Sequence, residues 1–393
     1  NDQVSIRCMD IFGILSMIGG LALFLYGMEA MGAGLSKLSG GRMERLLEKL
    51  TSKRIMAVLL GAGVTAVIQS SSATTVMVVG FVNSGIMKLN QAVGIIMGAN
   101  IGTTITSWLL SLTGIQGSSF ILKMLKPSSF SPILAIVGII FIMFTKDEKK
   151  KDIGGIFLGF AILMYGMEAM SGAVAPLADN EKFTGILTMF SNPILGLLAG
   201  TILTAVIQSS SASVGILQAL CATGAVNFST ALPIIMGQNI GTCVTAIISS
   251  IGTSKNAKRA AAVHLFFNIS GTVIFMVVFY TLNTFVHFSF LNTAASPAGI
   301  AVIHSLFNIG ATILLFPFAN LLEKMAILAI PDKGSEVEEM EEEKINPDLA
   351  RLDERFLDKP GFAMEECRGV AINMARKSKK AMNLAIDLLK EYD

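Results

Sequence analysis

A block of nine residues occurs twice without change in this chain, at positions 65–73 and 204–212. Each copy holds a glutamine followed by three serines, Gln69 to Ser72 and Gln208 to Ser211, inside a long apolar stretch. Unpaired polar groups are costly in hydrocarbon, so a chain that uses this cluster twice must provide polar partners for it. Serine hydroxyls and backbone N–H groups can hold an anion, while the glutamine oxygen and unwound carbonyls suit a small hard cation. We therefore expect an ion-binding site at the two blocks.

The serines also predict a break in the helix. Serine competes for nearby backbone groups and so favours helix ends, which makes each block a natural tip between two half-helices. The N-terminus of a half-helix exposes N–H groups and a partial positive charge, which can hold an anion without an intramembrane Lys or Arg. A cation bound beside the anion would neutralise its charge.

A second polar block, Ile95 to Thr104, has its counterpart at Ile234 to Cys243. Both copies offer an asparagine, hydroxyl groups and glycines that let the backbone approach a ligand. The copies differ because Gln238 replaces an alanine and Cys243 replaces a threonine. The two halves therefore need not bind the same ion.

Close helix packing is the alternative explanation, because small and hydroxyl-bearing residues also occur where membrane helices touch. Four polar residues in a row, duplicated and followed at a fixed distance by Asn-Ile-Gly-Thr, favour a ligand site instead. Hydrolysis by the serines is disfavoured, because no His, Lys or acid lies near them in sequence to act as a base. We therefore expect no enzyme activity, and we expect no cofactor. The four cysteines lack the spacing of a metal site, so we also expect no transition metal.

Composition places the elements around these blocks in a membrane. Of the 393 residues 52% are hydrophobic and only 15% are charged, with a mean hydropathy of +0.66. About 20 apolar residues span the hydrocarbon core, so the long uncharged runs can cross it several times. The net charge of +2 shows no nucleic-acid footprint, so we expect membrane lipid and no nucleic acid among the partners.

The duplication covers more than the two polar blocks. Residues 26–31 match 165–170, and all the matching pairs are 139 residues apart, which indicates one duplicated unit. The candidate spans, of which not all need cross fully, are 11–35, 55–82, 91–112, 132–144, 153–174, 194–222, 230–251, 260–285 and 298–321.

The basic residues indicate how the two units are oriented. Loops rich in Lys and Arg stay in the cytoplasm. The loop 36–54 has six of them, whereas its counterpart 175–192 has only Lys182, so equivalent loops face opposite sides. The predicted fold is an all-α polytopic membrane protein of two inverted-topology repeats with re-entrant hairpins or broken helices, plus a short cytoplasmic helical tail.

The expected domain organisation follows from these patterns. We predict a first transmembrane repeat at 11–144, a second at 153–252 and two further transmembrane helices at 260–321. An acidic linker at 331–346 contains six glutamates within 336–343, which repel one another. The region 347–393 has apolar residues at helical spacing and is predicted to be part of a cytoplasmic helical unit.

Four titratable residues are duplicated within the predicted helices. Glu29 and Glu168 are intramembrane acids of the kind that often have a function, but both lie near helix ends, where a structural role is preferred. His264 and His304 open a smaller repetition. We favour packing for them over proton transfer, with titration near neutral pH as the alternative.

On the paired Gln-Ser-Ser-Ser blocks, the region 11–321 resembles the type II sodium-dependent phosphate cotransporters, and most closely their bacterial Na/Pi-cotransporter II-related members. The resemblance implies that inorganic phosphate binds to Gln69, Ser70, Ser71, Ser72, Gln208, Ser209, Ser210 and Ser211. The residues expected to bind or surround sodium are Thr65, Asn100, Thr103, Thr104, Thr204, Asn239 and Thr242. The segment from Pro347, including Leu352 to Leu357, looks like the start of a PhoU-like helical domain.

Together with the membrane pattern, the resemblance implies a symporter that moves phosphate with sodium as its coupling ion across the plasma (inner) membrane, with a cytoplasmic C-terminus. A homodimer is one candidate assembly, and uptake and export stay open. An anion or cation channel lined by the blocks is one alternative. A membrane-anchored phosphate sensor acting through its cytoplasmic helical domain is the other. Two polar-tipped repeats around one cavity favour the carrier.

Overall fold

The computed structural model describes residues 11–39, 53–115, 126–178, 180–331, 357 and 360–390. Over these ranges the chain is helical and contains no β-strand. Six helices are long and apolar enough to cross a membrane, and the bent pair Lys182–Met189 and Pro193–Ile207 would make a seventh. The prediction of an all-α polytopic membrane protein is confirmed. Most of the basic loop 36–54, the acidic stretch 336–343 and residues 352–356 of the PhoU-like motif lie outside the described residues.

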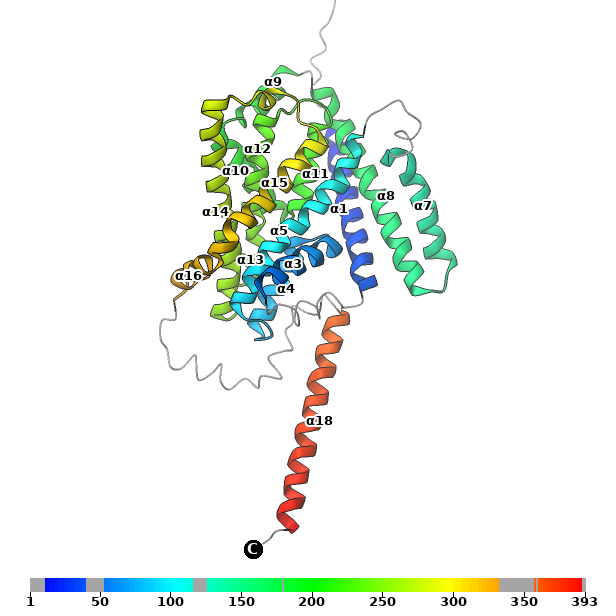
Figure 1. Cartoon of the computed structure of the whole chain (residues 1–393). Helices are drawn as coiled ribbons and strands as arrows, with labels where there is room; N and C mark the ends of the chain where they lie inside the picture. Colours follow the sequence, from blue (N-terminus) through cyan, green and yellow to red (C-terminus); the bar gives the residue numbers. More distant parts are fainter. Residues whose placement is uncertain are drawn as a thin grey trace, which may run out of the picture.

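The helices follow the duplicated pattern (Figure 1). In the first half they are α1 (Ile11–Ser39), α3 (Arg54–Ile68), α4 (Ser71–Asn83), α5 (Leu89–Ser111) and α7 (Pro127–Phe144). In the second half they are α8 (Glu148–Val174), α9 (Glu181–Met189), α10 (Pro193–Ile207), α11 (Ser210–Cys221), α12 (Phe228–Gly241) and α13 (Cys243–Ser249). The other helices in the described part of the chain are α14 (Lys255–Val286), α15 (Pro297–Leu315), α16 (Ala319–Ala329) and α18 (Pro360–Lys390). Short 3-10 turns are η1 (Leu112–Gly114), η2 (Ala175–Leu177), η3 (Ser289–Asn292) and η4 (Phe316–Phe318).

Helices α1 and α8 pack along a seam of glycines. Gly20 lies against the backbone of Gly166, and Gly27 lies against that of Gly159, so the two helices are antiparallel. Gly159 and Gly166 are also the counterparts of Gly20 and Gly27 in the second repeat. Exchanging the two halves therefore maps one contact onto the other, which is the pseudo-twofold relation of an inverted repeat.

Each span that carries a serine block is broken into a hairpin. In the first hairpin, Gly61 lies against Ile95, and Gly102 lies against Ala62 further along both helices, so α3 and α5 run parallel. The intervening α4 must then return to the side from which α3 started. Helices α10 and α12 make the equivalent contacts, from Gly200 against Ile234 onwards, so α11 returns in the same way.

The two hairpins open on opposite ends of the bundle. The Ser254 N–H donates to Asn83 Oδ1 at 2.8 Å, so α14 begins beside the end of α4. Beyond the other end of α14, the Ala295 N–H donates to the Val226 carbonyl, just before α12, at 2.7 Å. Helix α14 has 32 residues, which at about 1.5 Å each separate these two ends by about 48 Å.

The predicted span 230–251 corresponds to α12 and α13, which together form one membrane-length segment, Phe228–Ser249, with Thr242 between them in a helical backbone conformation. The tail residues from Pro360 form one helix, α18, whose side chains are mostly exposed and which extends from the end of the bundle where α16 lies (Figure 1).

Candidate functional site

The glutamine that ends the first half-helix has an unusual backbone in both hairpins. Gln69 has φ 61° and Gln208 has φ 59°, and in the described part of the chain His287 is the one other non-glycine residue with a positive φ. The left-handed conformation is unfavourable for a side-chain-bearing residue and is found where the fold imposes it. In each copy the glutamine N–H donates to the carbonyl four residues earlier, of Thr65 or Thr204, at 2.7 Å. The fold thus imposes the same sharp turn twice.

The first serine of each block starts the second half-helix. The Ser70 hydroxyl accepts from the Ala73 N–H at 3.1 Å, and the Ser209 hydroxyl accepts from the Ala212 N–H at 3.2 Å. These are N-caps, which satisfy one of the N–H groups that a helix start leaves without an intrahelical partner. The N–H groups of the next two residues in α4 and α11 stay available at the positive end of the helix.

The two tips meet. The Ser72 hydroxyl of the first hairpin donates to the Gln208 carbonyl of the second at 3.3 Å. The same carbonyl accepts from the Thr245 hydroxyl at 3.4 Å. Two segments that enter from opposite ends of the bundle and lie 136 residues apart in sequence are therefore in direct contact. The sequence pattern required this arrangement for a single shared site.

Three further serines at the tips are buried, and their hydroxyls, unlike those of Ser70 and Ser209, have no hydrogen-bond partner among the described residues. Ser71 is 3% exposed, and Ser210 and Ser211 are each 5% exposed. No charged side chain occurs in either block. The arrangement therefore offers hydroxyl and N–H donors for an anion, and hydroxyl, carbonyl and amide oxygens for a cation.

The side chains of the two glutamines lie in different surroundings. Gln69 is 5% exposed, and its amide oxygen accepts from the Thr106 hydroxyl at 3.0 Å. Its amide nitrogen donates to the Ala66 carbonyl. Gln208 is exposed, and its side chain makes no hydrogen bond within the described part of the chain. Gln69 is thus held by the fold, and Gln208 is available to a ligand.

The threonines that precede the blocks differ in the same direction. Thr65 donates to the Thr74 hydroxyl at 3.0 Å. Their counterparts, Thr204 and Ser213, are both fully buried, and neither hydroxyl has a hydrogen-bond partner among the described residues. A bound water or ion is one way in which such a hydroxyl can obtain its missing partner.

The Asn-Ile-Gly-Thr blocks are connected to α14 or to their own helices and not to the tips. Asn100 donates to the Asn268 side chain at 2.9 Å, and Asn268 donates to Cys243 Sγ at 3.4 Å. Asn268 therefore links the two repeats. Four other predicted sodium residues donate to carbonyls within their own helix: Thr103, Thr104, Asn239 and Thr242. No hydrogen bond between these residues and the serine blocks occurs in the described part of the chain.

Sequence reasoning missed three residues at or near the site. Thr106 and Thr245, which contact the two glutamines, are counterparts at the same offset of 139 residues, so the repeat could have identified them. Asn268 lies in the smaller repetition that begins at His264, in which only the histidines were considered as candidates for function. His264 is fully buried and His304 is 1% exposed, with no partner for either ring among the described residues. Glu29 and Glu168 are exposed.

A helical membrane protein of two inverted repeats, with a polar break in each repeat and the two breaks in contact, has the architecture of a secondary transporter. The chain belongs to the Na+/Pi-cotransporter family, whose family model matches residues 23–172 and 162–296. This is a family of transporters and not of enzymes, which agrees with the expectation from the serine surroundings. The family resemblance seen in the sequence is confirmed.

Individual relatives support the same assignment. The chain is 29% identical over 322 residues to the uncharacterized protein YqeW of Bacillus subtilis, covering 81% of this chain and 99% of that protein. It is 27% identical over 323 residues to YjbB of Salmonella typhimurium, whose name assigns it provisionally to inorganic phosphate export. That match covers 81% of this chain but 56% of YjbB. Sodium-dependent phosphate transport protein 2A of Rattus norvegicus is 22% identical over 380 residues, which is 66% of this chain and 60% of that protein. No solved structure gives a significant match.

Proposed function

We propose that the chain carries inorganic phosphate together with sodium across the plasma membrane and binds both where the two tips meet. The contact of Ser72 with the Gln208 carbonyl at 3.3 Å is the observation that carries the proposal. It brings two polar helix breaks from opposite ends of the bundle into one place, as alternating access around a single site requires. The family and the name of the rat relative supply the identity of the two ions.

Phosphate binding is assigned to the starts of α4 and α11. Each start presents N–H groups and the positive end of the helix dipole, which favour an oxyanion. The buried hydroxyls of Ser71, Ser210 and Ser211 and the exposed Gln208 amide add donors around it. A site without Lys or Arg holds phosphate moderately, which suits a substrate that must leave again.

Sodium binding is assigned to the second hairpin. A small hard cation prefers oxygen ligands, and the unpaired Thr204 hydroxyl lies buried in the helix that leads to the second tip. The equivalent hydroxyl in the first hairpin, on Thr65, is already bonded to Thr74. The sodium residues predicted in the Asn-Ile-Gly-Thr blocks then act as surroundings that hold α5 and α12 in place.

The basic residues orient the proposed carrier. Arg54, Lys88 and Lys255 stand at the starts of α3, α5 and α14, all on the end of the bundle where the first hairpin opens. Lys and Arg are retained on the cytoplasmic side. The first hairpin and the C-terminal helices α16 and α18 are therefore assigned to the cytoplasm, and the second hairpin to the outside.

The test is uptake of radiolabelled phosphate into proteoliposomes that contain the purified chain. An inward sodium gradient is expected to drive concentrative uptake, and a potassium gradient of the same size is expected to drive none. Uptake that is equal with the two cations would refute the coupling. Single-channel currents across a bilayer would identify a channel, and phosphate binding without translocation would identify a sensor.

Substitutions at the tips test the site within the same assay. Ser71→Ala and Ser210→Ala each remove a buried uncommitted hydroxyl and are expected to lower phosphate transport at least about tenfold, which corresponds to about 1.4 kcal/mol of binding. Ser131→Ala is the matched control, because Ser131 is 2% exposed in α7, away from both blocks. Equal transport in all three variants would remove the tips from the proposal.

Export is the second candidate direction, favoured by the provisional assignment of YjbB to phosphate export. A symporter runs in whichever direction the combined gradients dictate, so the same site can serve both directions. Efflux from phosphate-loaded vesicles, with sodium placed first inside and then outside, separates the two. Efflux that needs internal sodium fits the same coupled carrier, while efflux independent of sodium on both sides fits an uncoupled exporter.

A further inference from the structure

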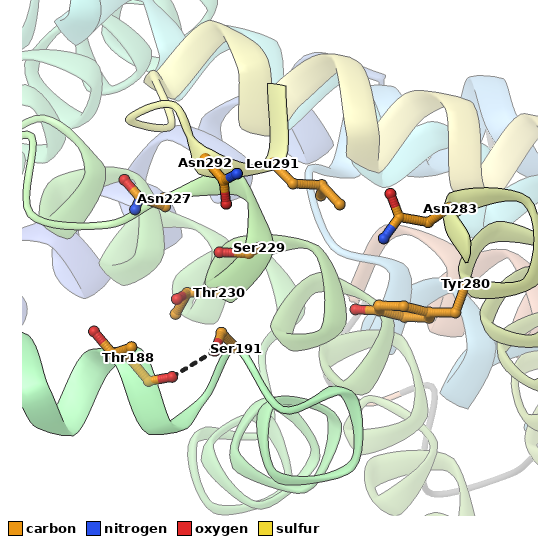
Figure 2. A pocket seen from close by; sticks show the side chains of 9 residues that line it. All are labelled: Thr188, Ser191, Asn227, Ser229, Thr230, Tyr280, Asn283, Leu291 and Asn292. Atoms are coloured by element: carbon orange, nitrogen blue, oxygen red, sulfur yellow. Dashed lines mark hydrogen bonds between the residues drawn. The ribbon is translucent and has the colours of Figure 1, made fainter. Parts of the chain in front are cut away.

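A polar cavity lies at the end of the bundle where the second hairpin opens. It has a volume of about 390 Å³ and is bordered by α9 and the turn after it, the start of α12, the end of α14 and η3 (Figure 2). The residues that line it are Thr188, Ser191, Asn227, Ser229, Thr230, Tyr280, Asn283, Leu291 and Asn292. All but the leucine are polar, and none is charged.

The cavity is separate from the tips. Ser191 lies just before α10 and Gln208 just after it. Helix α10 has 15 residues, which at about 1.5 Å each place the two ends about 22 Å apart. A ligand in the cavity therefore cannot contact the serine blocks.

Some of the lining groups already have partners in the fold. The hydroxyls of Thr188 and Ser191 donate to carbonyls of their own segment at 2.7 and 2.6 Å. Thr230 donates to the Leu187 carbonyl at 3.3 Å. The Asn283 side-chain oxygen accepts from the Phe288 N–H at 2.9 Å, which leaves the Asn283 amide nitrogen as a donor.

The other lining groups are uncommitted. The side chains of Asn227, Ser229 and Asn292 make no hydrogen bond within the described residues. The Tyr280 hydroxyl is fully buried and has no partner there either. In Figure 2, Tyr280 and Asn283 face the cavity from one side, and Asn227, Ser229 and Asn292 lie on the other side. Four accessible side-chain donors, those of Asn227, Ser229, Asn283 and Asn292, thus border one space, and the buried Tyr280 hydroxyl lies beside it.

The start of α12 adds a further attraction for an anion. This helix has 14 residues, and its N-cap, Asn227, makes no side-chain capping bond. The Phe228 and Thr230 N–H groups bond to the Thr293 and Asn227 carbonyls, so the Ser229 N–H is left at the positive end of the helix. No lining residue is acidic, so nothing in the cavity wall repels an anion.

We propose that this cavity is a second oxyanion site that takes inorganic phosphate reversibly at the end of the bundle opposite the starts of α3, α5 and α14. The choice of phosphate rests on the proposed function, while the preference for an oxyanion rests on the donors. A wall without cationic side chains binds phosphate weakly and exchanges it quickly, as expected of a site that phosphate occupies just before or just after it is transported. A phospholipid headgroup offers the same chemistry and is the competing occupant.

The test measures equilibrium binding of radiolabelled phosphate to the purified full chain in a phosphate-free detergent. The background carries Ser71→Ala and Ser210→Ala, so that the tips contribute little. We expect one weak class of sites to remain. Asn227→Asp puts a carboxylate at an N-cap, where it suits the helix, and is expected to weaken the remaining binding about tenfold or more through charge repulsion.

Asn180→Asp is the matched control, because Asn180 is the N-cap of α9 and does not line the cavity. It is expected to leave binding unchanged. Equal binding in the two aspartate variants, or no binding in the tip background, would overturn the proposal. Displacement of phosphate by a short-chain phosphatidylglycerol but not by sulfate would reassign the cavity to a lipid. Absence of transport in the wild type together with binding sensitive to Asn227→Asp would refute the proposed function and retain the cavity site.

Discussion

The two hairpins have the same nine residues at their tips and the same positive φ at the glutamine, but they differ in what the tips contact. The Gln69 side chain is buried and bonded to Thr106, whereas the Gln208 side chain is exposed. Thr106 has a threonine, Thr245, as its counterpart, so the difference does not come from local sequence. It comes from where the rest of the fold places each tip.

The largest effects on stability are expected at the glycines through which the helices of each hairpin pack. A Cβ on Gly98 would overlap the Val58 carbonyl, and one on Gly237 would overlap the Leu197 carbonyl. Gly98→Ala and Gly237→Ala are each expected to lower the free energy of unfolding by about 3 kcal/mol, because neither backbone can give way. Thermal unfolding in detergent measures this. Gly63→Ala, with open space around it, should cost nothing, and a large loss in only one of the two tight positions would show that the scaffolds are not equivalent.

The glutamines test the asymmetry itself. Gln69→Ala leaves the buried Thr106 hydroxyl without its acceptor and should lower the free energy of unfolding by about 2 kcal/mol. Gln208→Ala removes an exposed side chain and should change stability by less than about 0.5 kcal/mol, while phosphate transport falls. Thermal unfolding and uptake are measured on the same preparations. Equal destabilisation by the two substitutions would contradict the described difference.

The capping serines should behave alike, because each makes the same bond at the start of its half-helix. Ser70→Ala and Ser209→Ala are each expected to cost about 1 kcal/mol of stability. Ser70→Thr and Ser209→Thr keep the hydroxyl and should restore most of it. Chemical unfolding of the four variants measures these changes, and a loss of stability in one hairpin alone would mean that the two caps are not equivalent.

The smallest effect on stability is expected at Thr204, the counterpart of Thr65 in the second hairpin. Thr65→Val breaks the bond to Thr74 and should cost about 1 kcal/mol, whereas Thr204→Val replaces an unpaired hydroxyl by an isosteric methyl and should be close to neutral. If Thr204 contributes to sodium binding, the same variant needs more sodium for half-maximal transport. A sodium dependence unchanged in Thr204→Val would remove that residue from the sodium site.

Much of the fold could be predicted from the sequence because the duplicated blocks, 139 residues apart, are directly visible in it. The register of the duplicated blocks and the distribution of Lys and Arg predicted inverted units, and the glycine contacts between α1 and α8 agree with that prediction. Serine chemistry predicted the broken helices, whose breaks fall at Gln69 and Gln208. These features follow from local propensity and from symmetry, both of which a single chain displays.

The parts of the site that depend on tertiary placement could not be predicted in this way. The link from Asn100 through Asn268 to Cys243 joins residues from three helices, and no spacing in the sequence relates them. The polar cavity combines residues from 188 to 292. The unequal burial of Gln69 and Gln208 could not be predicted from two identical blocks, because it depends on how the two repeats pack against the rest of the protein.

The glycine seam between α1 and α8 has a consequence for how the chain is made. The flat face of α1, with Gly20 and Gly27, enters the membrane before its partner face has been synthesised. More than about 100 residues separate the two helices, which at about 5–20 residues per second leaves α1 without its mate for roughly 5–20 s. The contact between α1 and α8 can therefore form only after the whole first repeat has been synthesised, and the contact between the two serine tips only later still.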